Sequence, residues 1–366
     1  MTRALYINGR FLTQPSTGVQ RYAREIVANF DSLLEDNELA NQVCIRCLVP
    51  RGAPRNASWK HITLEEVGVN HGNLWEQFDL PLHLKGGFLF SPANSGPLLY
   101  QNQAVTFHDA SVFATPRAYS FWFRLKYKLI FTSLARLAKV IFTVSKFSQS
   151  ELSHYLKQPF EKFKVVSLAG DHIDRIQSDT RILSKHNLFK DGYIFIVGSQ
   201  SPHKNLGTVW KALEFINGDI KVVFAGAQYQ KIFNKEAVRA RAKKNIIALG
   251  YITDEELKAV YLNALGFTLP SYYEGFGLPV LEAMHCGCPV LCAQAASLPE
   301  VAGNAALFFD PMDASDMANS IGQIVLDPQL RNDLTQKGYQ RAKDFSWRAT
   351  ASQTMDALLT ALKTHP

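Results

Sequence analysis

The stretch SYYEGFGLPVLE, which runs from Ser271 to Glu282, combines two glycines, a proline and two glutamates in one short segment. An apolar run that ends at Pro270 comes directly before it and predicts a short strand. The run from Pro279 to His285 predicts a helix, because proline is well placed in a first helical turn, where its missing N–H is not needed. The sequence therefore predicts a strand, a glycine-containing loop and a helix, in this order.

The loop between the predicted strand and helix is suited to a phosphate group. Gly275 and Gly277 allow the backbone to approach a ligand closely. The N–H groups of Phe276, Gly277 and Leu278 come at the start of the helix, where they lack an intrahelical partner and where the helix dipole favours an anion. We therefore expect these four residues to contact a bound phosphate.

Two glutamates stand on either side of the glycines, Glu274 in the predicted loop and Glu282 in the predicted helix. A carboxylate accepts two hydrogen bonds at once, which suits the vicinal hydroxyls of a ribose. We predict that one glutamate holds a ribose and that the other contacts the group beyond a diphosphate. The alternative is a solvated loop glutamate and a helix glutamate favoured by the dipole. The Gly-Phe-Gly-Leu-Pro spacer favours the first interpretation.

From Glu274 to Val290 the chain reads EGFGLPVLEAMHCGCPV. This segment resembles the donor site of retaining glycosyltransferases of family four, whose hallmark is usually written EGFGLPxxEAMAxGxPV. His285 is the one visible departure, since alanine is usual there. With weaker motifs, the resemblance covers nearly the whole chain. It implies an α/β fold of the GT-B type, in which two Rossmann-like parallel-sheet domains face a cleft and a C-terminal helix crosses back to the first domain.

The length of 366 residues suggests two domains of ordinary size, and a hydrophobic content of 47% is enough for two cores. The polar region 174–191 has no strong strand pattern, so we place the linker there. We expect an N-terminal acceptor-side domain at 1–178, a C-terminal nucleotide-sugar-binding domain at 179–345, and a terminal helix at 346–366 that packs on the first domain. The chain begins with a strand pattern and has no long apolar run, so we expect a cytoplasmic protein.

The formal net charge of +7 favours anionic partners, which include nucleotides, phosphates, acidic lipids and nucleic acids. The five cysteines are an odd number and do not predict a disulfide framework. Cys44 and Cys47 have C-x-x-C spacing but lie in an apolar, strand-like run. The other cysteines lack a His/Cys pair at zinc spacing, so we predict no metal site.

A candidate donor contact lies near the N-terminus. The loop Thr13–Gly18 precedes the helical pattern Val19–Phe30, and a strand, a glycine loop and a helix open a nucleotide-binding fold. The resemblance implies that this loop, through Gly18 and Val19, faces the donor diphosphate. An ordinary strand-to-helix turn explains a single glycine equally well.

His108 and Asp109 stand at the carboxyl end of the predicted strand 104–110. Ligands gather at this end of the strands in open α/β sheets. A single histidine is more often structural, but the resemblance implies a histidine close to the transferred sugar at this strand end. We therefore expect His108 to contact the donor sugar or to lie on the path of the acceptor.

Further candidate donor contacts belong to the predicted second domain. Lys204 follows a buried strand at a loop-to-helix junction, where its ammonium suits a diphosphate. Family four often has an arginine before this lysine, but none stands at Ser199 or Ser201, so we expect Ser199 to contribute polar contacts instead. The resemblance further implies that the nucleobase lies near Tyr251 and Ile252.

The segment Arg117–Lys139 interleaves aromatic residues with cations. This pattern fits a helix at an anionic bilayer surface, with its aromatic residues at headgroup depth. It fits a core helix with a solvated basic face equally well.

A retaining transfer from a nucleotide sugar requires donors and cations on the leaving diphosphate. In the common proposal for family four, a diphosphate oxygen itself takes the acceptor proton, so no dedicated base is needed. We expect His108, Glu274 and Lys204 to form the catalytic set. The chain has no Asp-x-Asp triplet, which is the usual signature of a metal site in such enzymes. We therefore predict metal-independent transfer without a cofactor.

The motifs are similar to those of bacterial mannosyl- and rhamnosyltransferases of polysaccharide assembly. We predict GDP-mannose as donor and a polyprenyl-diphosphate-linked saccharide as acceptor, at the inner face of the cytoplasmic membrane. The alternatives are a UDP- or dTDP-sugar transferase of the same fold, a basic nucleic-acid-binding protein, and a sugar-phosphate isomerase or phosphorylase.

Overall fold

The computed structural model describes residues 3–54, 59–199, 201–216, 220–226 and 245–364. The chain divides into two compact units. The N-terminal unit comprises Met1–Leu168 together with Trp347–Pro366, and the C-terminal unit comprises Ala169–Ser346. The boundary expected at residue 178 therefore lies inside the C-terminal unit.

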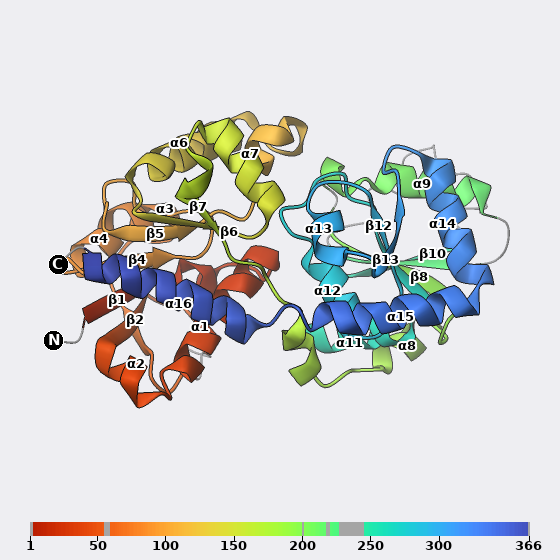
Figure 1. Cartoon of the computed structure of the whole chain (residues 1–366), viewed down its shortest axis with the longest axis horizontal. Helices are drawn as coiled ribbons and strands as arrows, with labels where there is room; N and C mark the ends of the chain where they lie inside the picture. The colour runs from red at the N-terminus through yellow and green to blue at the C-terminus, as the bar shows by residue number, and fades with distance from the viewer. Residues whose placement is uncertain (1–2, 55–58, 200, 217–219, 227–244, 365–366) are drawn as a thin grey trace. The chain divides into compact units, whose positions relative to one another are not determined.

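The N-terminal unit is built on a seven-stranded sheet in the order β3-β2-β1-β4-β5-β6-β7 (Figure 1). Every neighbouring pair is parallel. The strand order reverses between β1 and β4, and this reversal is the position at which ligands bind in doubly wound folds. The strands are β1 Arg3–Asn8, β2 Val43–Val49, β3 Thr63–Glu66, β4 Phe88–Ser91, β5 Gln103–Thr106, β6 Val140–Thr143 and β7 Phe163–Val165.

The C-terminal unit has a six-stranded sheet in the order β10-β9-β8-β11-β12-β13, again with parallel pairs. Its order reverses between β8 and β11. The strands are β8 Tyr193–Val197, β9 Lys221–Ala225, β10 Ile246–Gly250, β11 Gly266–Leu269, β12 Val290–Ala293 and β13 Ala306–Phe309. Two parallel Rossmann-like sheets confirm the expected α/β fold class.

The central strands are short apolar runs because helices cover both faces of each sheet. All residues of β4, β5, β6, β11 and β12 are buried. Helices of the N-terminal unit add aromatic packing, and the rings of Phe107 and Phe131 stack at 4.1 Å. The cysteines are all free thiols, and only Cys44 is exposed.

The helices of the N-terminal unit surround its sheet on both sides (Figure 1). They are η1 Gly9–Thr13, α1 Gly18–Leu33, α2 Asn37–Gln42, α3 Gly72–Leu74, η2 Trp75–Asp79, α4 Leu80–His83, α5 Ser111–Ala114, η3 Pro116–Ala118, α6 Phe121–Leu137, α7 Lys146–Leu156, η4 Phe160–Lys162 and α16 Trp347–Thr364. Within the described residues, no helix combines the length and the apolarity that a membrane-crossing segment needs.

The last of these helices, α16, follows the C-terminal unit in sequence but packs against α1 of the N-terminal unit (Figure 1). Trp347 is buried at its start, and its ring lies 6.2 Å from the ring of Tyr22. The hydroxyl of Thr350 donates to the carbonyl of Ser167 over 2.8 Å. The N-terminal unit is thus assembled from two separate parts of the sequence.

The helices of the C-terminal unit are η5 Asp171–Arg175, α8 Arg181–Lys185, η6 Pro202–Lys204, α9 Leu206–Phe215, α11 Asp254–Asn263, α12 Leu278–His285, α13 Leu298–Ala302, α14 Ala314–Leu326 and α15 Pro328–Ala342. The region predicted as linker contributes η5 and α8 to this unit. The ammonium of Lys258 donates to the carbonyls of Ile173 and Ile176, each over 2.9 Å. These contacts explain why the segment is structured despite its polar composition.

Candidate active site

Two loops meet where the strand order of the C-terminal sheet reverses. One follows β8 and contains η6 with Lys204, and the other follows β11 and contains Glu274. The backbone N–H of Tyr272 donates to the carbonyl of His203 over 3.0 Å, which joins the two loops. The topology therefore brings together two residues that the sequence predicted separately.

The Lys204 ammonium lies 2.6 Å from Oε1 of Glu274. Both side chains are mostly buried, with exposed fractions of 20% and 13%. Burial raises the pKa of the Glu274 carboxyl, but the charge of Lys204 and its hydrogen bond more than offset this, so the pKa lies below its ordinary value. Glu274 is consequently a carboxylate at neutral pH.

Asn205 fixes the loop that carries Lys204, and sequence reasoning did not single it out. Its backbone is left-handed, with φ of 58°, a conformation that asparagine tolerates better than most residues. Its Nδ2 donates to the carbonyl of Pro270 over 3.1 Å and to that of Pro311 over 2.6 Å. An asparagine directly before a predicted helix was the only available signal for this role.

Helix α12 begins at Leu278, with Pro279 in its first turn as predicted. Gly277 precedes it with φ of 98°, and a Cβ at this position would lie 2.6 Å from a methyl of Leu298. The side chains of Phe276 and Leu278 are buried and anchor the loop. Within the described residues, the backbone N–H groups of residues 276–278 donate no hydrogen bond. These groups are therefore available to an anion.

Glu282 lies on the buried side of α12, with an exposed fraction of 7%. The hydroxyl of Tyr261 lies 3.3 Å from Oε2, and Nε2 of His172 lies 3.3 Å from Oε1. Burial, together with the neighbouring carboxyl of Glu282, raises the pKa of Tyr261 well above its ordinary value. Tyr261 is therefore a hydrogen-bond donor to Glu282. The sequence indicated neither partner of this glutamate.

The remaining candidates of the C-terminal unit lie at its surface. Tyr251 is exposed directly after β10, and Ile252 is half-buried. Thr253 caps the start of α11 and forms a capping box with Glu256. Ser199 is exposed, and its hydroxyl lies 3.1 Å from that of Ser201.

Gly18 and Val19 form the first turn of α1 in the N-terminal unit. A Cβ at Gly18 would meet no atom within 4 Å. Packing within the protein therefore does not require a glycine there. The open space leaves room for a ligand against the backbone.

His108 is buried in the N-terminal unit, where its ring and the ring of Tyr22 are nearly perpendicular, with 4.8 Å between the ring centres. Its Nε2 lies 3.0 Å from the carbonyl of Pro92. Since a carbonyl only accepts, Nε2 carries the proton. Burial lowers the pKa of His108, so the ring is neutral and Nδ1 is without a proton.

Comparison with known proteins identifies the family of the chain. The sequence profile of the family described as "Glycosyl transferases group 1" matches residues 179–341. O-antigen chain mannosyltransferase B of Escherichia coli is 35% identical over 278 residues, which cover 72% of this chain and 72% of that protein. The chain belongs to the group 1 glycosyl transferases. The family-four resemblance of the Glu274 segment is thereby confirmed.

Solved structures show that this glycosyl transferase has the GT-B fold. Sucrose-phosphate synthase from Thermosynechococcus elongatus superimposes with a TM-score of 0.74 at 17% identity and covers 98% of both chains. Anabaena HepE in complex with UDP and glucose superimposes with a TM-score of 0.73 at 15% identity, covering 98% of this chain and 100% of that one. At these identities the similarity concerns the fold alone.

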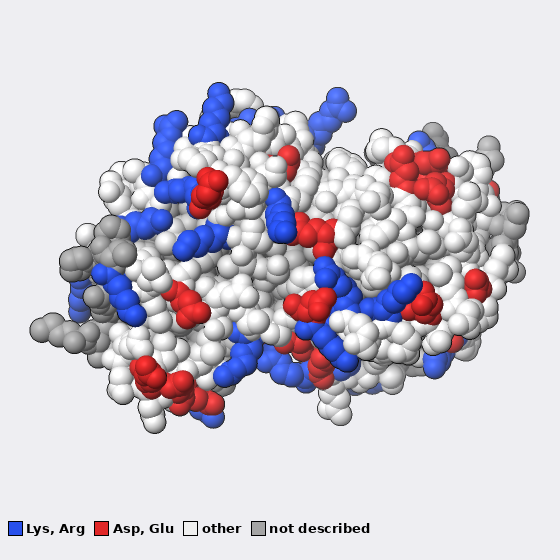
Figure 2. Space-filling view, viewed as in Figure 1, with Lys and Arg blue, Asp and Glu red and all other residues white. Residues whose placement is uncertain are grey.

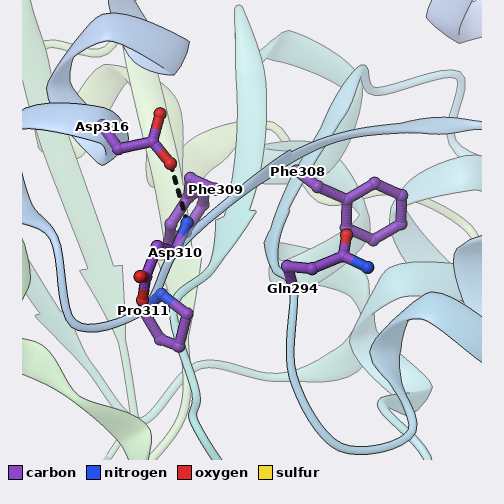
Figure 3. A pocket seen from close by; sticks show the side chains of 6 residues that line it. All are labelled: Gln294, Phe308, Phe309, Asp310, Pro311 and Asp316. Atoms are coloured by element: carbon purple, nitrogen blue, oxygen red, sulfur yellow. Dashed lines mark hydrogen bonds between the residues drawn. The ribbon is translucent and has the colours of Figure 1, made fainter.

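The glycosyl transferase also has an open pocket of about 490 Å³ beside β12 and β13 (Figure 3). Its lining contains none of the predicted site residues and consists of Gln294, Phe308, Phe309, Asp310, Pro311 and Asp316. The carboxylate of Asp316 accepts a hydrogen bond from the N–H of Asp310 over 2.8 Å. Through the bond from Asn205 to Pro311, this pocket borders the loop of Lys204.

Proposed function

We propose that this glycosyl transferase moves a hexose, in the first place mannose from GDP-mannose, onto a lipid-linked or oligosaccharide acceptor in bacterial surface polysaccharide assembly. The ion pair of Lys204 and Glu274 beside the free N–H groups of α12 carries the proposal. The similarity to a protein named as an O-antigen chain mannosyltransferase supports mannose over other hexoses.

In this proposal the donor diphosphate rests on the N–H groups of residues 276–278 and on the ammonium of Lys204. Fixed donors and a cation at the position where negative charge develops stabilise a transition state without reorganisation. Glu274 accepts hydrogen bonds from sugar hydroxyls, and Glu282 contacts the ribose. Gly18 and Val19 contact the diphosphate from the N-terminal unit, while Ser199, Tyr251 and Ile252 contact the nucleotide.

The proposed reaction retains the configuration of the anomeric carbon. The bond between this carbon and the diphosphate oxygen breaks, and the electron pair leaves with the diphosphate. The acceptor oxygen bonds to the same face of the sugar, and its proton passes to a diphosphate oxygen. His108 is neutral under these conditions, so its proposed role is a hydrogen bond to the sugar or the acceptor rather than a charge. NMR of the product's anomeric centre tests retention.

The proposed transfer needs neither a metal nor a cofactor. The proposal rests on the lack of an Asp-x-Asp triplet in the sequence and on the cationic Lys204 beside the α12 N–H groups. Activity in excess EDTA should equal activity in buffer. Complete loss in EDTA, with recovery on adding Mg²⁺ or Mn²⁺, would overturn this part of the proposal.

We further propose that the acceptor is a polyprenyl-diphosphate-linked saccharide and that the enzyme works at the inner face of the cytoplasmic membrane. In this scheme the N-terminal unit takes the acceptor and the C-terminal unit takes the nucleotide sugar. The net charge of +7 is compatible with both an anionic lipid carrier and an anionic donor.

A nucleotide-release assay tests the donor. GDP-mannose, UDP-glucose, UDP-N-acetylglucosamine and dTDP-rhamnose are compared, and we expect release from GDP-mannose. Glu274→Gln should abolish turnover while binding of GDP falls only modestly. Asp333→Asn is the matched control, because its carboxylate makes an exposed ion pair with Lys337.

The same preparation distinguishes the other functions. No release from any donor, together with tight and salt-dependent binding of an oligonucleotide, would replace the enzyme proposal by a nucleic-acid-binding one. Release from a UDP- or dTDP-sugar alone would keep the enzyme and change the donor. Wild-type behaviour of both Glu274→Gln and Glu282→Ala would refute the site.

A further inference from the structure

Helix α6 presents an apolar stripe to solvent. One face packs into the N-terminal unit through Ile130, Phe131, Leu134 and Ala135. Four exposed apolar side chains follow helical spacing and form the stripe, namely Phe121, Trp122, Leu125 and Leu129. Trp122 has an exposed fraction of 75%. A helix of a folded domain normally buries such a stripe, and an exposed one indicates a surface that binds a protein, a ligand or a membrane.

A second apolar stripe lies on the continuous helical segment formed by α3, η2 and α4. Leu74, Phe78 and Leu82 recur every four residues, and all three are exposed. The opposite face is anchored by Trp75 and Leu80, which are both fully buried. The sequence of residues 73–81 predicts a helix that stops at Pro81, so the stripe, which continues to Leu82, was not identified from the sequence.

The elements that carry the two stripes are linked through the loop that contains Leu98. The side chain of Gln77 in η2 bonds to the carbonyl of Gly96 over 3.0 Å and to the N–H of Leu98 over 2.9 Å. Leu98 in turn packs on the core cluster to which α6 contributes Ile130 and Phe131. The next residue, Leu99, is 94% exposed. The loop between the stripes is therefore apolar too.

Cations border this surface, and its own elements contribute no exposed acid. Helix α6 has no aspartate or glutamate but carries Arg124, Lys126, Lys128 and Arg136. By helical spacing, Lys126 and Lys128 lie at the two borders of the exposed stripe. The acids of the second segment, Glu76 and Asp79, are buried. Figure 2 shows Lys and Arg side chains gathered over the part of the N-terminal unit where Figure 1 labels α6.

The two bordering lysines lie over aromatic rings of the N-terminal unit. Nζ of Lys126 lies 5.4 Å from the ring centre of Tyr127, and Nζ of Lys128 lies 5.6 Å from that of Phe113. An apolar stripe with lysines along its borders suits an anionic bilayer, in which the apolar side chains enter and the ammonium groups reach the headgroups. A protein partner would instead favour an interface core depleted of charge.

We propose that this surface, formed by α6, the loop at Leu99 and the α3–η2–α4 segment, docks the N-terminal unit on an anionic lipid bilayer. This proposal rests on the proposed function, because an enzyme with a lipid-linked acceptor has to work at a membrane. Beyond the proposed function, it specifies which residues contact the membrane and that the lipids they bind are anionic.

Vesicle flotation of the full chain tests the docking surface without donor or acceptor. Vesicles of phosphatidylcholine alone are compared with vesicles that contain about 30% phosphatidylglycerol, and we expect binding to the anionic vesicles only. The double variant Phe78→Glu/Leu82→Glu and the double variant Trp122→Glu/Leu125→Glu should each weaken binding by about tenfold or more. Lys126→Gln/Lys128→Gln should weaken it by about fivefold for each lysine.

Leu326→Glu is the matched control, since Leu326 of the C-terminal unit is 82% exposed and Leu82 is 80% exposed. The substituted apolar side chains are exposed and the two lysines are half-buried, so thermal unfolding should change little. Equal binding of wild type and stripe variants, or equal binding to both lipid compositions, would overturn the proposal. So would a dimer that the stripe variants dissociate, because the occupant would then be a second copy. Nucleotide binding measured on the same samples shows separately whether the donor site is intact.

Discussion

At the scale of single residues, the ion pair between Lys204 and Glu274 is the most informative contact. Each residue was predicted from its own surroundings in the sequence. Their pairing was not, because it depends on β8 and β11 being neighbours in the sheet. The same limitation applies to Glu282, whose partners Tyr261 and His172 are distant in sequence. A motif identifies a residue type, and only the fold supplies its neighbours.

Lys204→Met should destabilise the C-terminal unit and weaken binding of a nucleoside diphosphate. Removing one member of a mostly buried pair costs about 3 kcal/mol, since the remaining charge is left uncompensated. We expect this loss in chemical unfolding at pH 7. Lys337→Met is the control, because its partner Asp333 is half exposed and the pair should be worth about 0.5 kcal/mol at most. Equal losses for the two variants would contradict the prediction.

The pH dependence of the stability of Lys204→Met follows from the pKa of Glu274, which in the wild type lies below its ordinary value of 4.5. A lowered folded-state pKa contributes stability above the unfolded pKa, and this contribution disappears as the pH falls through the folded pKa. In Lys204→Met burial remains without the compensating charge, so the pKa should rise above 4.5. Thermal unfolding between about pH 3.5 and 7 should therefore show the variant's deficit shrinking as the pH falls. A deficit that is constant across this range would refute the assignment.

Glu282→Ala should lower nucleotide affinity and also destabilise the C-terminal unit by about 1 to 3 kcal/mol, because it removes the nearer of the two acceptors of the buried Tyr261 hydroxyl and leaves only the carbonyl of Pro279 at 3.5 Å. Calorimetric titration with GDP and chemical unfolding measure the two effects. Tyr261→Phe removes the donor as well, so the double variant should be less destabilised than the sum of the two single variants. Glu255→Ala, at an exposed position of α11, is the control and should change neither quantity.

At the scale of elements, the proline-started helix α12 was predicted almost as observed, because proline and glycine restrict the backbone locally. The segment 171–185 was not, because its structure comes from tertiary hydrogen bonds such as those of Lys258. The exposed stripe of α3–η2–α4 was missed for a related reason. Its helix continues through Pro81, which occupies the first turn of α4 rather than ending the segment.

Gly277→Ala tests the turn that leads into α12. Its φ of 98° is unfavourable for any residue with a Cβ, and the added methyl would press against Leu298. We expect a loss of about 1 to 3 kcal/mol in unfolding free energy and weaker binding of GDP, because the N–H groups would move. Gly207→Ala in α9 is the matched control. Its Cβ meets no atom within 4 Å, so that variant should be neutral or slightly stabilised.

At the scale of the whole molecule, two parallel sheets and the two-domain organisation were predictable from strand patterns and chain length. The exact boundary was not, since the chain enters the C-terminal unit at Ala169 without a glycine- or proline-rich linker. The return of α16 to the N-terminal unit was expected from the resemblance alone. Its periodicity shows an amphipathic helix but does not indicate which unit receives the apolar face.

Trp347→Ala should destabilise the N-terminal unit by about 3 to 5 kcal/mol, since it empties a fully buried site next to Tyr22. Calorimetry should show a lower unfolding temperature for the N-terminal unit. Arg348→Ala, at the next and exposed position, is the control. An unfolding temperature equal to that of the wild type would contradict the assignment of this tryptophan to the core of the N-terminal unit.

The placement of α16 also has a consequence for biosynthesis. A ribosome makes all of Ala169–Ser346 before it makes the helix that covers α1. The first-made half of the protein therefore remains incomplete during translation, with the apolar surface around Tyr22 open, while the second-made half can already close its own sheet. Nascent chains stalled at residue 346 should consequently recruit chaperones to their earliest segment, and chains extended through α16 should release them.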